Sequence, residues 1–361
     1  MTNKKRIIVA MSGGVDSSVA ALLLREQGHD IAGMTMSLGL SNRDEYNGMK
    51  RGSAEEIEDA RRVCRTLGID HYVMDCALAL EDKVIQPFIS EYLRGRTPNP
   101  CVECNRSIKF DLLLNKALSL GFDAIATGHY ARIAQESPHY FLRTPKDQKK
   151  DQTYFLYVLN PSALPRIVFP LADYTKDEVR QKAKAAGLPV SEKTDSQDVC
   201  FIPQKRLDLF LEKRSITVKT GPIIHRTGRR LGYHQGIAHY TVGQRTGLGI
   251  SWPVPLYVLE IDAEDNELIV GEKEDLKAEG LKADCVNLLV DCLPSRAVVK
   301  IRYAHQGVKS HVSLKDGELC VRFDVPQEAV APGQSAVLYE EKTILGGGII
   351  KEVLVGYQGK N

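Results

Sequence analysis

Residues 6–24 read RIIVAMSGGVDSSVAALLL, which places a strand-like apolar run, a glycine turn and an apolar helix in direct succession. The adjacent glycines Gly13 and Gly14 allow backbone N–H groups to converge on one point. Ser12, Ser17 and Ser18 add hydroxyl donors around that point. Because the following helix directs the positive end of its dipole to the same place, the stretch predicts a site for a pyrophosphate-like anion.

This glycine turn differs from the two commonest nucleotide-binding motifs. The Gly-Lys-Ser/Thr ending of a Walker loop is absent, which argues against transfer of a terminal phosphoryl group by a P-loop enzyme. The spacing GxGxxG of a dinucleotide-binding fold is absent as well. A plain strand-to-helix turn with a serine cap is the structural alternative.

The first 200 residues alternate short apolar runs with helical patterns, which indicates a parallel α/β sheet. The expected strands are 6–11, 31–38, 71–74 and 124–127. The expected helices are 17–26, 54–67, 80–93, 110–120 and 176–186. Ser53 and Thr175 each precede an acidic residue by three positions, as in a capping box, and Gly68 and Gly187 follow two of the helices.

The texture of the sequence then changes twice. After residue 203 it becomes basic, rich in glycine and dense in turns, and from about 281 apolar residues alternate with polar ones. The alternating runs are 297–303, 310–314, 318–323 and 335–339, with a hairpin signal at 315–318. We expect an α/β domain over 1–203, a central module over 204–278 and a small antiparallel β-barrel over 279–361.

The charge of the chain is unevenly distributed. Its 361 residues are 43% hydrophobic and 26% charged with a net charge of +2, a globular composition rather than a disordered or fibrous one. Residues 204–250 contain nine Lys and Arg but only two acids, a local charge of +7 that leaves −5 for the rest. A basic module on a mildly acidic body indicates a polyanionic partner, and a solvated basic face is the alternative.

The sequence also bears on location. No run approaches the roughly 20 uninterrupted apolar residues of a membrane helix, and no signal-peptide core precedes the first strand. We therefore expect a cytosolic protein with no membrane partner, in which the eight cysteines are reduced thiols. Cys64 and Cys76 are expected to be buried as small apolar residues in a helix and a strand.

Three other cysteines lie in polar segments. Cys101 and Cys104 form a Cys-x-x-Cys pair in TPNPCVECN, residues 97–105, a loop directly before an expected helix. A helix N-terminus favours the thiolate form. Cys200 lies in DSQDVCFI, residues 195–202. The pattern favours sulfur or iron–sulfur chemistry, with a zinc half-site and a purely structural pair as alternatives.

The glycine turn closely resembles the PP-loop of ATP pyrophosphatases, which cleave ATP between the α and β phosphates and activate a substrate oxygen as its adenylate. The resemblance implies that the loop grips the departing pyrophosphate with help from Mg²⁺, and that Asp16 serves the metal or the loop geometry. The residues implied in ATP binding are Ala10, Met11, Ser12, Gly13, Gly14, Val15, Asp16 and Ser17, with Met36 and Gly128 near the adenosine.

Further motifs make the chain similar to the tRNA 2-thiouridylases of the MnmA type. They are ATGHYA at 126–131, KDQTYFL at 150–156, TVGQR at 241–245, Arg302-Tyr303 and APGQ at 331–334. Together with the loop and the cysteines they span nearly the whole chain in order. The resemblance implies ATP-dependent thiolation of the tRNA wobble uridine at C2, with release of AMP and pyrophosphate.

The same resemblance implies roles for individual residues. The target base would lie against Asn99, Pro100 and Cys101. The tRNA contacts would be His129, Lys150, Asp151, Gln152, Arg302, Tyr303 and Gln334. Cys200 would receive sulfur as a persulfide, while Cys104 would act as the nucleophile that assists transfer and then closes a disulfide with it. The implied partners are tRNAs for Lys, Glu and Gln and a sulfur donor such as a cysteine desulfurase or a sulfur-relay protein.

Cys101 departs from the family pattern, because some relatives carry an Asp there. It leaves three thiols, Cys101, Cys104 and Cys200, which are alternatively the ligands of an iron–sulfur cluster with one open position for sulfide. Apart from that alternative no metal site is predicted. Two rival functions are a PP-loop ligase that aminates a small-molecule adenylate and a tRNA-binding scaffold with zinc at the Cys-x-x-Cys pair.

Overall fold

The structure is a computed structural model that describes residues 4–39, 54–194, 199–202 and 206–355. Contacts between residues divide the chain into two units. Unit 1 comprises Met1–Val84, Cys101–Lys205 and Lys342–Ile344. Unit 2 comprises Ile85–Pro100, Arg206–Glu341 and Leu345–Asn361.

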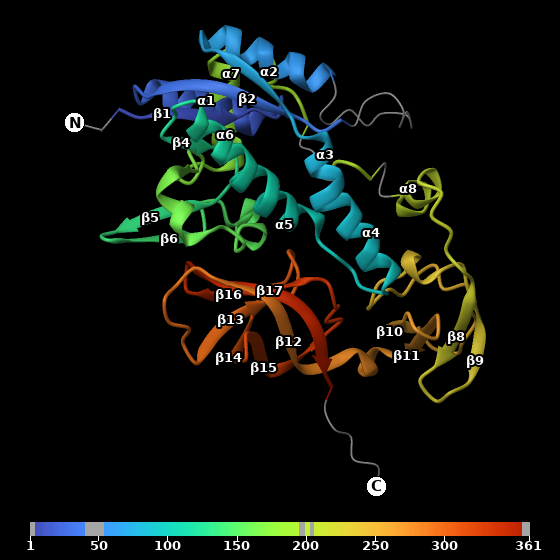
Figure 1. The fold of residues 1–361 in the computed structure, drawn as a ribbon. Helices are drawn as coiled ribbons and strands as arrows, with labels where there is room; N and C mark the ends of the chain where they lie inside the picture. The colour runs from blue at the N-terminus through green and yellow to red at the C-terminus, as the bar shows by residue number, and fades with distance from the viewer. Residues whose placement is uncertain (1–3, 40–53, 195–198, 203–205, 356–361) are drawn as a thin grey trace. The chain divides into compact units, whose positions relative to one another are not determined.

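A five-stranded parallel sheet forms the centre of unit 1 (Figure 1). Its strands, in spatial order, are β3 (His71–Asp75), β2 (Asp30–Ser37), β1 (Arg6–Ala10), β4 (Ala124–Ala126) and β7 (Ile167–Val168). The four longer strands confirm the strands predicted from sequence, and β7 is too short to give a signal. Because β1 pairs with β2 on one side and β4 on the other, the strand order reverses at β1, and ligands bind at such a switch point in open α/β sheets.

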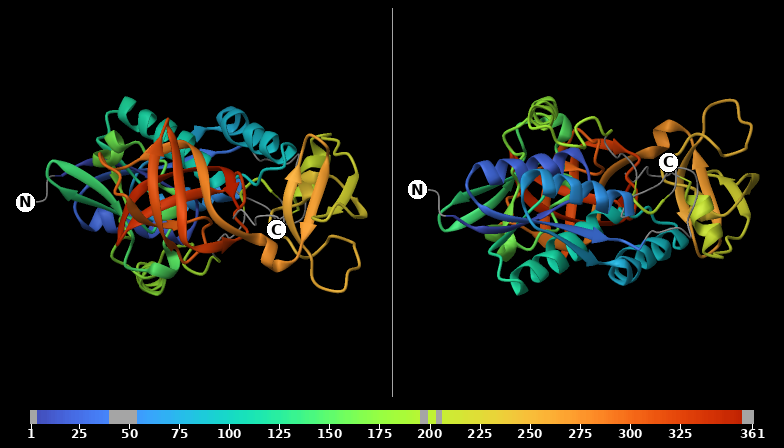
Figure 2. Two further views of the ribbon diagram at one scale, coloured as in Figure 1. Left: turned by 90° about the horizontal axis from the view of Figure 1, so that it is seen from below. Right: turned by 90° about the horizontal axis from the view of Figure 1, so that it is seen from above.

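Three helices pack on this sheet and complete its core (Figures 1 and 2). They are α1 (Val15–Glu26), α2 (Ala54–Leu67) and α7 (Lys176–Ala185). Fully buried aliphatic side chains of α1, α2 and α7, such as Val19, Val63 and Val179, meet those of β1. The capping box at Thr175 is confirmed, and Gly68 and Gly187 adopt the positive φ of helix C-terminal glycines. Ser53 lies outside the described residues.

Two further helical stretches are longer than predicted. The first runs through α3 (Ala77–Leu80), the π-helical turn η1 (Glu81–Ile85) and α4 (Gln86–Leu93). The second runs through α5 (Pro100–Cys104), the π-helical η2 (Asn105–Leu112) and α6 (Leu113–Ser119). The prediction of a loop for the whole of 97–105 is therefore wrong, since helix begins at Pro100. Proline suits a first helical position because its φ is preset and its missing N–H is not needed there.

The rest of unit 1 consists of a hairpin and short 3₁₀ turns. The hairpin pairs β5 (Arg132–Glu136) with β6 (His139–Arg143). The 3₁₀ turns are η3 (Gln148–Lys150), η4 (Thr153–Phe155) and η5 (Pro161–Arg166). None of these had been predicted, because segments this short carry little periodicity.

Unit 2 contains a four-stranded sheet in the order β10-β11-β8-β9. Its strands are β8 (Gly221–His225), β9 (Arg230–His234), β10 (Tyr257–Asp262) and β11 (Glu267–Gly271), preceded in the chain by α8 (Leu207–Lys213). The 3₁₀ turn η7 (Ile237–His239) follows β9. A small core that includes Ile223, Val258 and Leu268 holds this sheet together.

The C-terminal part of unit 2 is a closed six-stranded antiparallel barrel, which confirms the predicted fold class. After the 3₁₀ turn η8 (Lys273–Leu276), the strands are β12 (Lys277–Leu288), β13 (Arg296–Lys300), β14 (Val308–Lys315), β15 (Glu318–Glu328), β16 (Ser335–Glu340) and β17 (Thr343–Leu354). Their order is β12-β15-β14-β13-β16-β17, and pairing of β12 with β17 closes the ring. The hairpin at 315–318 is confirmed, with Asp316 and Gly317 both at positive φ.

Two local predictions need correction. The strand expected over 297–303 ends at Lys300, so Arg302 and Tyr303 lie in the turn that follows β13. Cys76 is buried as expected but follows β3 instead of lying in it. Among the described residues, no helix has the length and apolarity needed to cross a membrane.

Barrel closure predicts the effect of a methyl group at Gly280. This residue pairs with Arg322 of β15 and Leu354 of β17, and an added Cβ would lie 2.2 Å from the carbonyl oxygen of Val321. We expect Gly280→Ala to lower the free energy of unfolding by about 1–3 kcal/mol, measured by urea denaturation. Glu279→Ala, at the exposed neighbouring position of β12, is the matched control. Equal stability of the two variants would contradict this account of closure.

Candidate functional site

The residues predicted to bind a nucleotide gather at one edge of the parallel sheet. The segment 10–17 follows β1, Met36 lies near the end of β2, and Gly128 lies two residues after β4. Since these three strands are neighbours and parallel, their carboxyl ends meet. The sequence-predicted set is therefore brought together by the fold.

The glycine turn is held in shape by its own serines. Ser12 N–H donates to Ser17 Oγ at 3.2 Å, and the hydroxyls of Ser17 and Ser18 donate to the Gly14 carbonyl at 3.2 and 2.8 Å. Gly13 has a φ of +66°, and a Cβ there would lie 2.6 Å from the Glu56 carbonyl of α2. Ser18 is fully buried, so the prediction that its hydroxyl faces an anion is wrong. Ser12 remains exposed at the turn.

Asp16 lies in an ion pair at the first turn of α1. Both of its carboxylate oxygens accept from Lys176 Nζ, at 2.7 and 2.8 Å, and Oδ1 also accepts from the Tyr130 hydroxyl at 2.9 Å. Lys176 is itself buried. Because this lysine already neutralises the carboxylate, the arrangement favours the loop-geometry role for Asp16 over direct metal binding.

A second lysine reaches the glycine turn itself. Lys193 Nζ donates to the Gly13 carbonyl at 3.1 Å and to Asp59 Oδ2 at 2.7 Å. Asp59 also pairs with Arg62, and these two cations hold the pKa of its carboxyl below the usual value despite its burial. Lys176 and Lys193 were not predicted from sequence, because they lie 160 and 180 residues from their partners in the turn.

Gly128 packs directly on the first turn of α1. A Cβ at this position would lie 2.7 Å from Ser17 N and 2.8 Å from the Asp16 carbonyl carbon. The absence of a side chain allows the end of β4 to approach the first turn of α1 this closely.

His129 is a half-buried histidine. Its Nδ1 lies 2.7 Å from Thr127 Oγ1, and its ring packs against Phe110 and Phe169 with centroids 5.7 and 6.1 Å away. Burial lowers the pKa of His129 well below its ordinary value, and the charge of Lys109 acts in the same direction. The ring is therefore neutral at pH 7, so any contact it makes with RNA is not that of a cation with a phosphate.

The neighbouring segment 150–153 is tied to Tyr130 by hydrogen bonds. Gln152 Oε1 accepts from Tyr130 N–H at 2.9 Å, and Gln152 N–H donates to the Tyr130 carbonyl. Asp151 Oδ1 accepts from the N–H and the hydroxyl of Thr153 and is buried. Asp151 and Gln152, two of the three predicted tRNA contacts in this segment, therefore hold its backbone in place. Lys150, the third, is the last residue of the 3₁₀ turn η3.

The three candidate cysteines differ in environment. Cys101 is exposed in the first turn of the helix that begins at Pro100, and Cys104 and Cys200 are partly exposed. Burial raises the pKa of the Cys104 thiol, although Lys109 opposes this. The prediction that the helix N-terminus favours a Cys104 thiolate is therefore wrong. Burial raises the pKa of the other pair, Cys64 and Cys76, to about 11, which confirms them as inert interior thiols.

The described cysteines do not form a metal site. Over residues 4–39, 54–194, 199–202 and 206–355, no group of three or more His, Cys, Asp or Glu is arranged to hold a metal ion. Cys101, Cys104 and Cys200 belong to this part of the chain, so their thiols do not present the donor set of a cluster in this structure.

Within unit 2, the barrel anchors the segment that precedes Asn99 and Pro100. Thr97 N–H donates to the Pro332 carbonyl at 2.8 Å, and Gln334 Nε2 donates to the Thr97 carbonyl at 2.8 Å. Gln334, a predicted tRNA contact, therefore also fixes the predicted base-binding segment. Arg302 and Tyr303 are both exposed in their turn, which excludes a core position for Tyr303.

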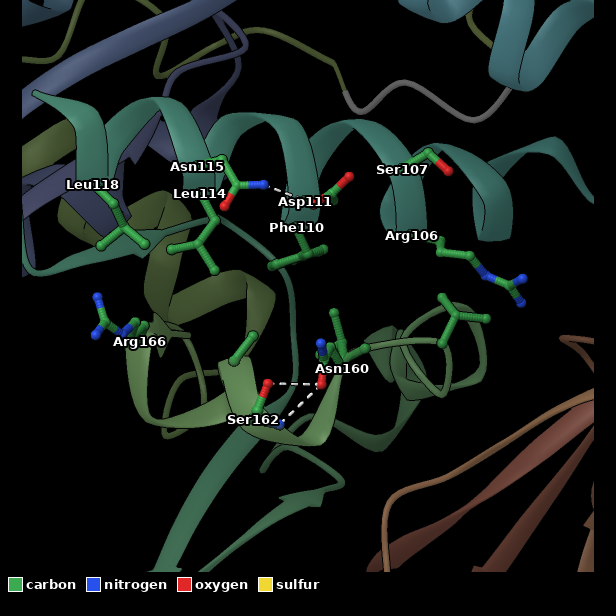
Figure 3. Close-up of a pocket in the computed structure, with 13 residues that line it drawn as sticks. Arg106, Ser107, Phe110, Asp111, Leu114, Asn115, Leu118, Asn160, Ser162 and Arg166 are labelled. Atoms are coloured by element: carbon green, nitrogen blue, oxygen red, sulfur yellow. Dashed lines mark hydrogen bonds between the residues drawn. The ribbon is translucent and has the colours of Figure 1, made fainter.

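A groove of about 510 Å³ lies along the helix η2–α6, opposite η5 (Figure 3). Arg106 and Arg166 flank it, and Asn115 donates to Asp111 at 2.8 Å on its helical wall. Asn160 accepts from Ser162 on the facing wall. The groove contains none of the residues predicted from sequence.

The lowered pKa of His129 predicts a pH dependence of stability. Its folded pKa is depressed from 6.5, so the unfolded chain binds more protons below that pH, and stability present above about pH 6.5 is lost as the pH falls toward the folded pKa. We expect the free energy of unfolding to fall between about pH 7 and 5.5, by up to roughly 1.4 kcal/mol per unit from this residue, and less steeply in His129→Asn. An imidazole NMR signal of His129 that titrates near pH 6.5 would contradict this.

Three family models match consecutive parts of the chain. They are the tRNA methyl transferase HUP domain at residues 5–204, the tRNA methyl transferase PRC-barrel domain at 209–272 and the aminomethyltransferase beta-barrel domain at 278–350.

Full-length relatives agree with these matches. The chain is 51% identical over 351 residues to tRNA-specific 2-thiouridylase MnmA 1 of Syntrophus aciditrophicus, covering 97% of this chain and 94% of that protein. It is 49% identical over 353 residues to tRNA-specific 2-thiouridylase MnmA of Syntrophotalea carbinolica, covering 96% and 98%. A solved 4-thiouridine synthetase–RNA complex with bound ATP aligns at 20% identity and a TM-score of 0.34, over 58% of this chain and 50% of that chain. The identities to full-length relatives confirm the resemblance inferred from the motifs: the chain belongs to the family of tRNA-specific 2-thiouridylases, MnmA.

Proposed function

We propose that this chain is an ATP-dependent tRNA sulfurtransferase that replaces O2 of the wobble uridine with sulfur. The observation that carries the proposal is the glycine turn at the carboxyl edge of the sheet, with Lys176 and Lys193 directed onto it. Such a turn binds a pyrophosphate, and the full-length relatives that share the chain's sequence are named 2-thiouridylases.

The first chemical step is adenylation of the uridine. O2 of the base attacks the α-phosphorus of ATP, the bond to the β-phosphate oxygen breaks, and pyrophosphate leaves. Backbone N–H groups at Gly13 and Gly14, the exposed Ser12 hydroxyl and the N-terminus of α1 receive the pyrophosphate charge. Lys193, now 3.1 Å from the Gly13 carbonyl, is placed to add a cation. Mg²⁺, when bound, would neutralise phosphate charge during this step.

The adenosine half of ATP fits the surface beside Gly128. That glycine lets the end of β4 pack against the backbone of Asp16 and Ser17, and Met36 lies near the end of β2. The target base would lie against Asn99, Pro100 and Cys101, where Gln334 holds the preceding Thr97 in place. Adenylation makes C2 electrophilic, because the oxygen then leaves as part of AMP.

Sulfur transfer follows from the two thiols Cys104 and Cys200. A persulfide on Cys200 attacks C2 through its terminal sulfur and displaces AMP. Cys104 then attacks the Cys200 sulfur, forms a Cys104–Cys200 disulfide and releases the thiolated base. An external thiol must reduce that disulfide before the next turnover. Because desolvation raises the pKa of the Cys104 thiol, it must lose its proton as it attacks, with Lys109 stabilising the developing thiolate.

The persulfide comes from a protein donor, for which a cysteine desulfurase or a relay carrier supplies the right chemistry. The tRNA partners are those for Lys, Glu and Gln, held in part by the basic module 204–278 and by Lys150, Arg302 and Tyr303. The division into a catalytic domain (1–203), this module and the barrel (279–361) belongs to the same proposal, as does a cytoplasmic site of action.

Sulfide delivery by an iron–sulfur cluster on Cys101, Cys104 and Cys200 is the second candidate mechanism. Three cysteine ligands that leave one iron position open for sulfide would suit such a cluster, which favours this mechanism. Among the described residues, however, no three His, Cys, Asp or Glu side chains are arranged to hold a metal ion. We therefore derive no step through a cluster. Purification under anaerobic conditions with iron and sulfide analysis separates the two mechanisms, because an iron-free protein that thiolates tRNA rules out the cluster.

The cysteine roles predict the outcome of a thiolation assay. Purified protein, unmodified tRNA, ATP, Mg²⁺ and a persulfide donor should yield a 16 Da mass gain on the wobble uridine after nuclease digestion. We expect Cys200→Ser to abolish the gain and Cys104→Ser to reduce it at least 100-fold, because sulfur can no longer be received or released. Cys292→Ser, at an exposed position in unit 2, is the matched control and should retain full activity.

The same assay distinguishes the rival functions. AMP formation without tRNA, with ammonia-dependent turnover that survives Cys200→Ser, would identify an amidating ligase. Stoichiometric zinc with tRNA binding but no ATP cleavage would identify a scaffold. Either result would overturn the proposal.

Gly128 predicts a defect specific to ATP. Gly128→Ala would place a Cβ 2.7 Å from Ser17 N. This clash must displace either the first turn of α1 or residue 128 itself, and both lie at the proposed adenosine site. We expect the KM for ATP to rise about tenfold or more while the KM for tRNA changes little. Steady-state kinetics at saturating tRNA measures this, with the melting temperature as a check on folding. An unchanged KM for ATP would place the adenosine elsewhere.

A further inference from the structure

The central sheet of unit 2 carries a groove of about 420 Å³ that no predicted residue role explains. Its lining comes from a single loop between β9 and β10: Arg245, Gly247, Leu248, Gly249, Ile250, Trp252, Pro253, Val254, Pro255 and Leu256. Leu248 and Leu256 point into the core of the sheet, so the loop is anchored. Nothing approaches within 4 Å of a Cβ built on Gly249, which leaves backbone accessible there.

The β8–β9 hairpin joins this groove through Trp252, the only tryptophan of the chain. His225, at the end of β8, stacks on the Trp252 ring with centroids 4.9 Å apart and planes 27° apart. The guanidinium carbon of Arg229, beside the first residue of β9, lies 5.3 Å from the same ring's centroid. The aromatic pair therefore positions an arginine at the groove.

The charge of this arginine is not compensated by a carboxylate. In the described part of the chain neither Arg229 nor Arg245 forms an ion pair, whereas Arg226 in the same hairpin turn pairs with Asp275. A cation–π contact holds a guanidinium in place without cancelling its charge. Two uncompensated arginines at one groove, in a stretch with a local charge of +7, make a site for an anion.

We propose that this groove binds the sugar–phosphate backbone of tRNA, with Arg229 and Arg245 contacting phosphates and Trp252 holding Arg229 in position. The proposal rests on the proposed function, which supplies the polyanion. An RNA backbone fits the chemistry because guanidinium groups pair with phosphate oxygens, and glycine N–H groups add donors that need no particular base. The groove thus contributes affinity for tRNA and no selection of the wobble base.

The single tryptophan allows a direct binding experiment. Titration of the full-length protein with unmodified tRNA should change Trp252 emission in a saturable way, because a phosphate that engages Arg229 alters the cation over the indole. Arg229→Gln and Arg245→Gln should each raise the Kd for tRNA about 5- to 10-fold at moderate salt and lower the slope of log Kd against log salt by roughly 0.7–0.9. At saturating tRNA, kcat should stay at the wild-type value.

A matched control lies in the same strand. Arg230 also sits over an aromatic ring, with its guanidinium carbon 5.5 Å from the centroid of Tyr233, but Tyr233 does not line the groove, whereas Trp252, the ring under Arg229, does. Arg230→Gln removes the same charge and the same kind of contact, so it should change the Kd less than twofold. Trp252→Phe, which keeps a ring under Arg229, should bind tRNA better than Trp252→Leu.

The outcomes separate this proposal from the proposed function. Suppose that wild-type protein thiolates tRNA, that its Trp252 emission does not respond to tRNA, and that Arg229→Gln and Arg245→Gln keep the wild-type KM for tRNA. The groove proposal is then wrong, while the proposed function stands. The proposal would also be overturned if Arg230→Gln raised the Kd for tRNA as much as Arg229→Gln, because the effect would then reflect the general positive charge of the hairpin and not this groove. If wild-type protein neither binds nor thiolates tRNA, both proposals fail. Arg245→Gln, in an exposed loop position, guards against misfolding of the hairpin variant.

Discussion

The first turn of α1 is held between two close backbone contacts, and the site depends on both. Gly13 lies against the Glu56 carbonyl of α2, and Gly128 lies against Ser17 and Asp16, at distances that leave no room for a Cβ. These contacts bring the ends of three parallel strands to one point. A glycine at each contact is a steric requirement, because any other residue would push the turn away from the sheet edge where an anion can bind.

Two ion pairs also hold the glycine turn and the first turn of α1 in place. Lys176 neutralises Asp16, and Lys193 joins the turn to Asp59 on α2. Partly buried pairs of this kind cost a great deal when one partner is lost, since the remaining charge has no water to replace it. Lys193 has a second consequence, because it lies seven residues before Cys200 in the chain. One side chain thereby joins the glycine turn to a position seven residues before the cysteine that is proposed to carry sulfur.

Burial sets the protonation states that the proposed chemistry must start from. His129 is kept neutral and Cys104 is kept as a thiol. In the proposed mechanism, a neutral Cys104 would not attack the Cys200 sulfur before the substrate is in place. In unit 2 an aromatic ring positions Arg229 where a carboxylate would otherwise compensate its charge.

The sequence by itself determined the features that depend on near neighbours in the chain. The glycine turn after the first strand, the capping box at Thr175 and the hairpin at Asp316 and Gly317 are local, and each was predicted at its observed position. The family motifs likewise identified the candidate site residues by their order along the chain. Only the tertiary structure decided which distant groups complete them: Lys176 pairs with Asp16 across 160 residues, and Gln334 holds Thr97 across 237. It also decided burial, and with it the protonation of Cys104 and His129, because desolvation depends on every element packed around a group and not on its neighbours in sequence.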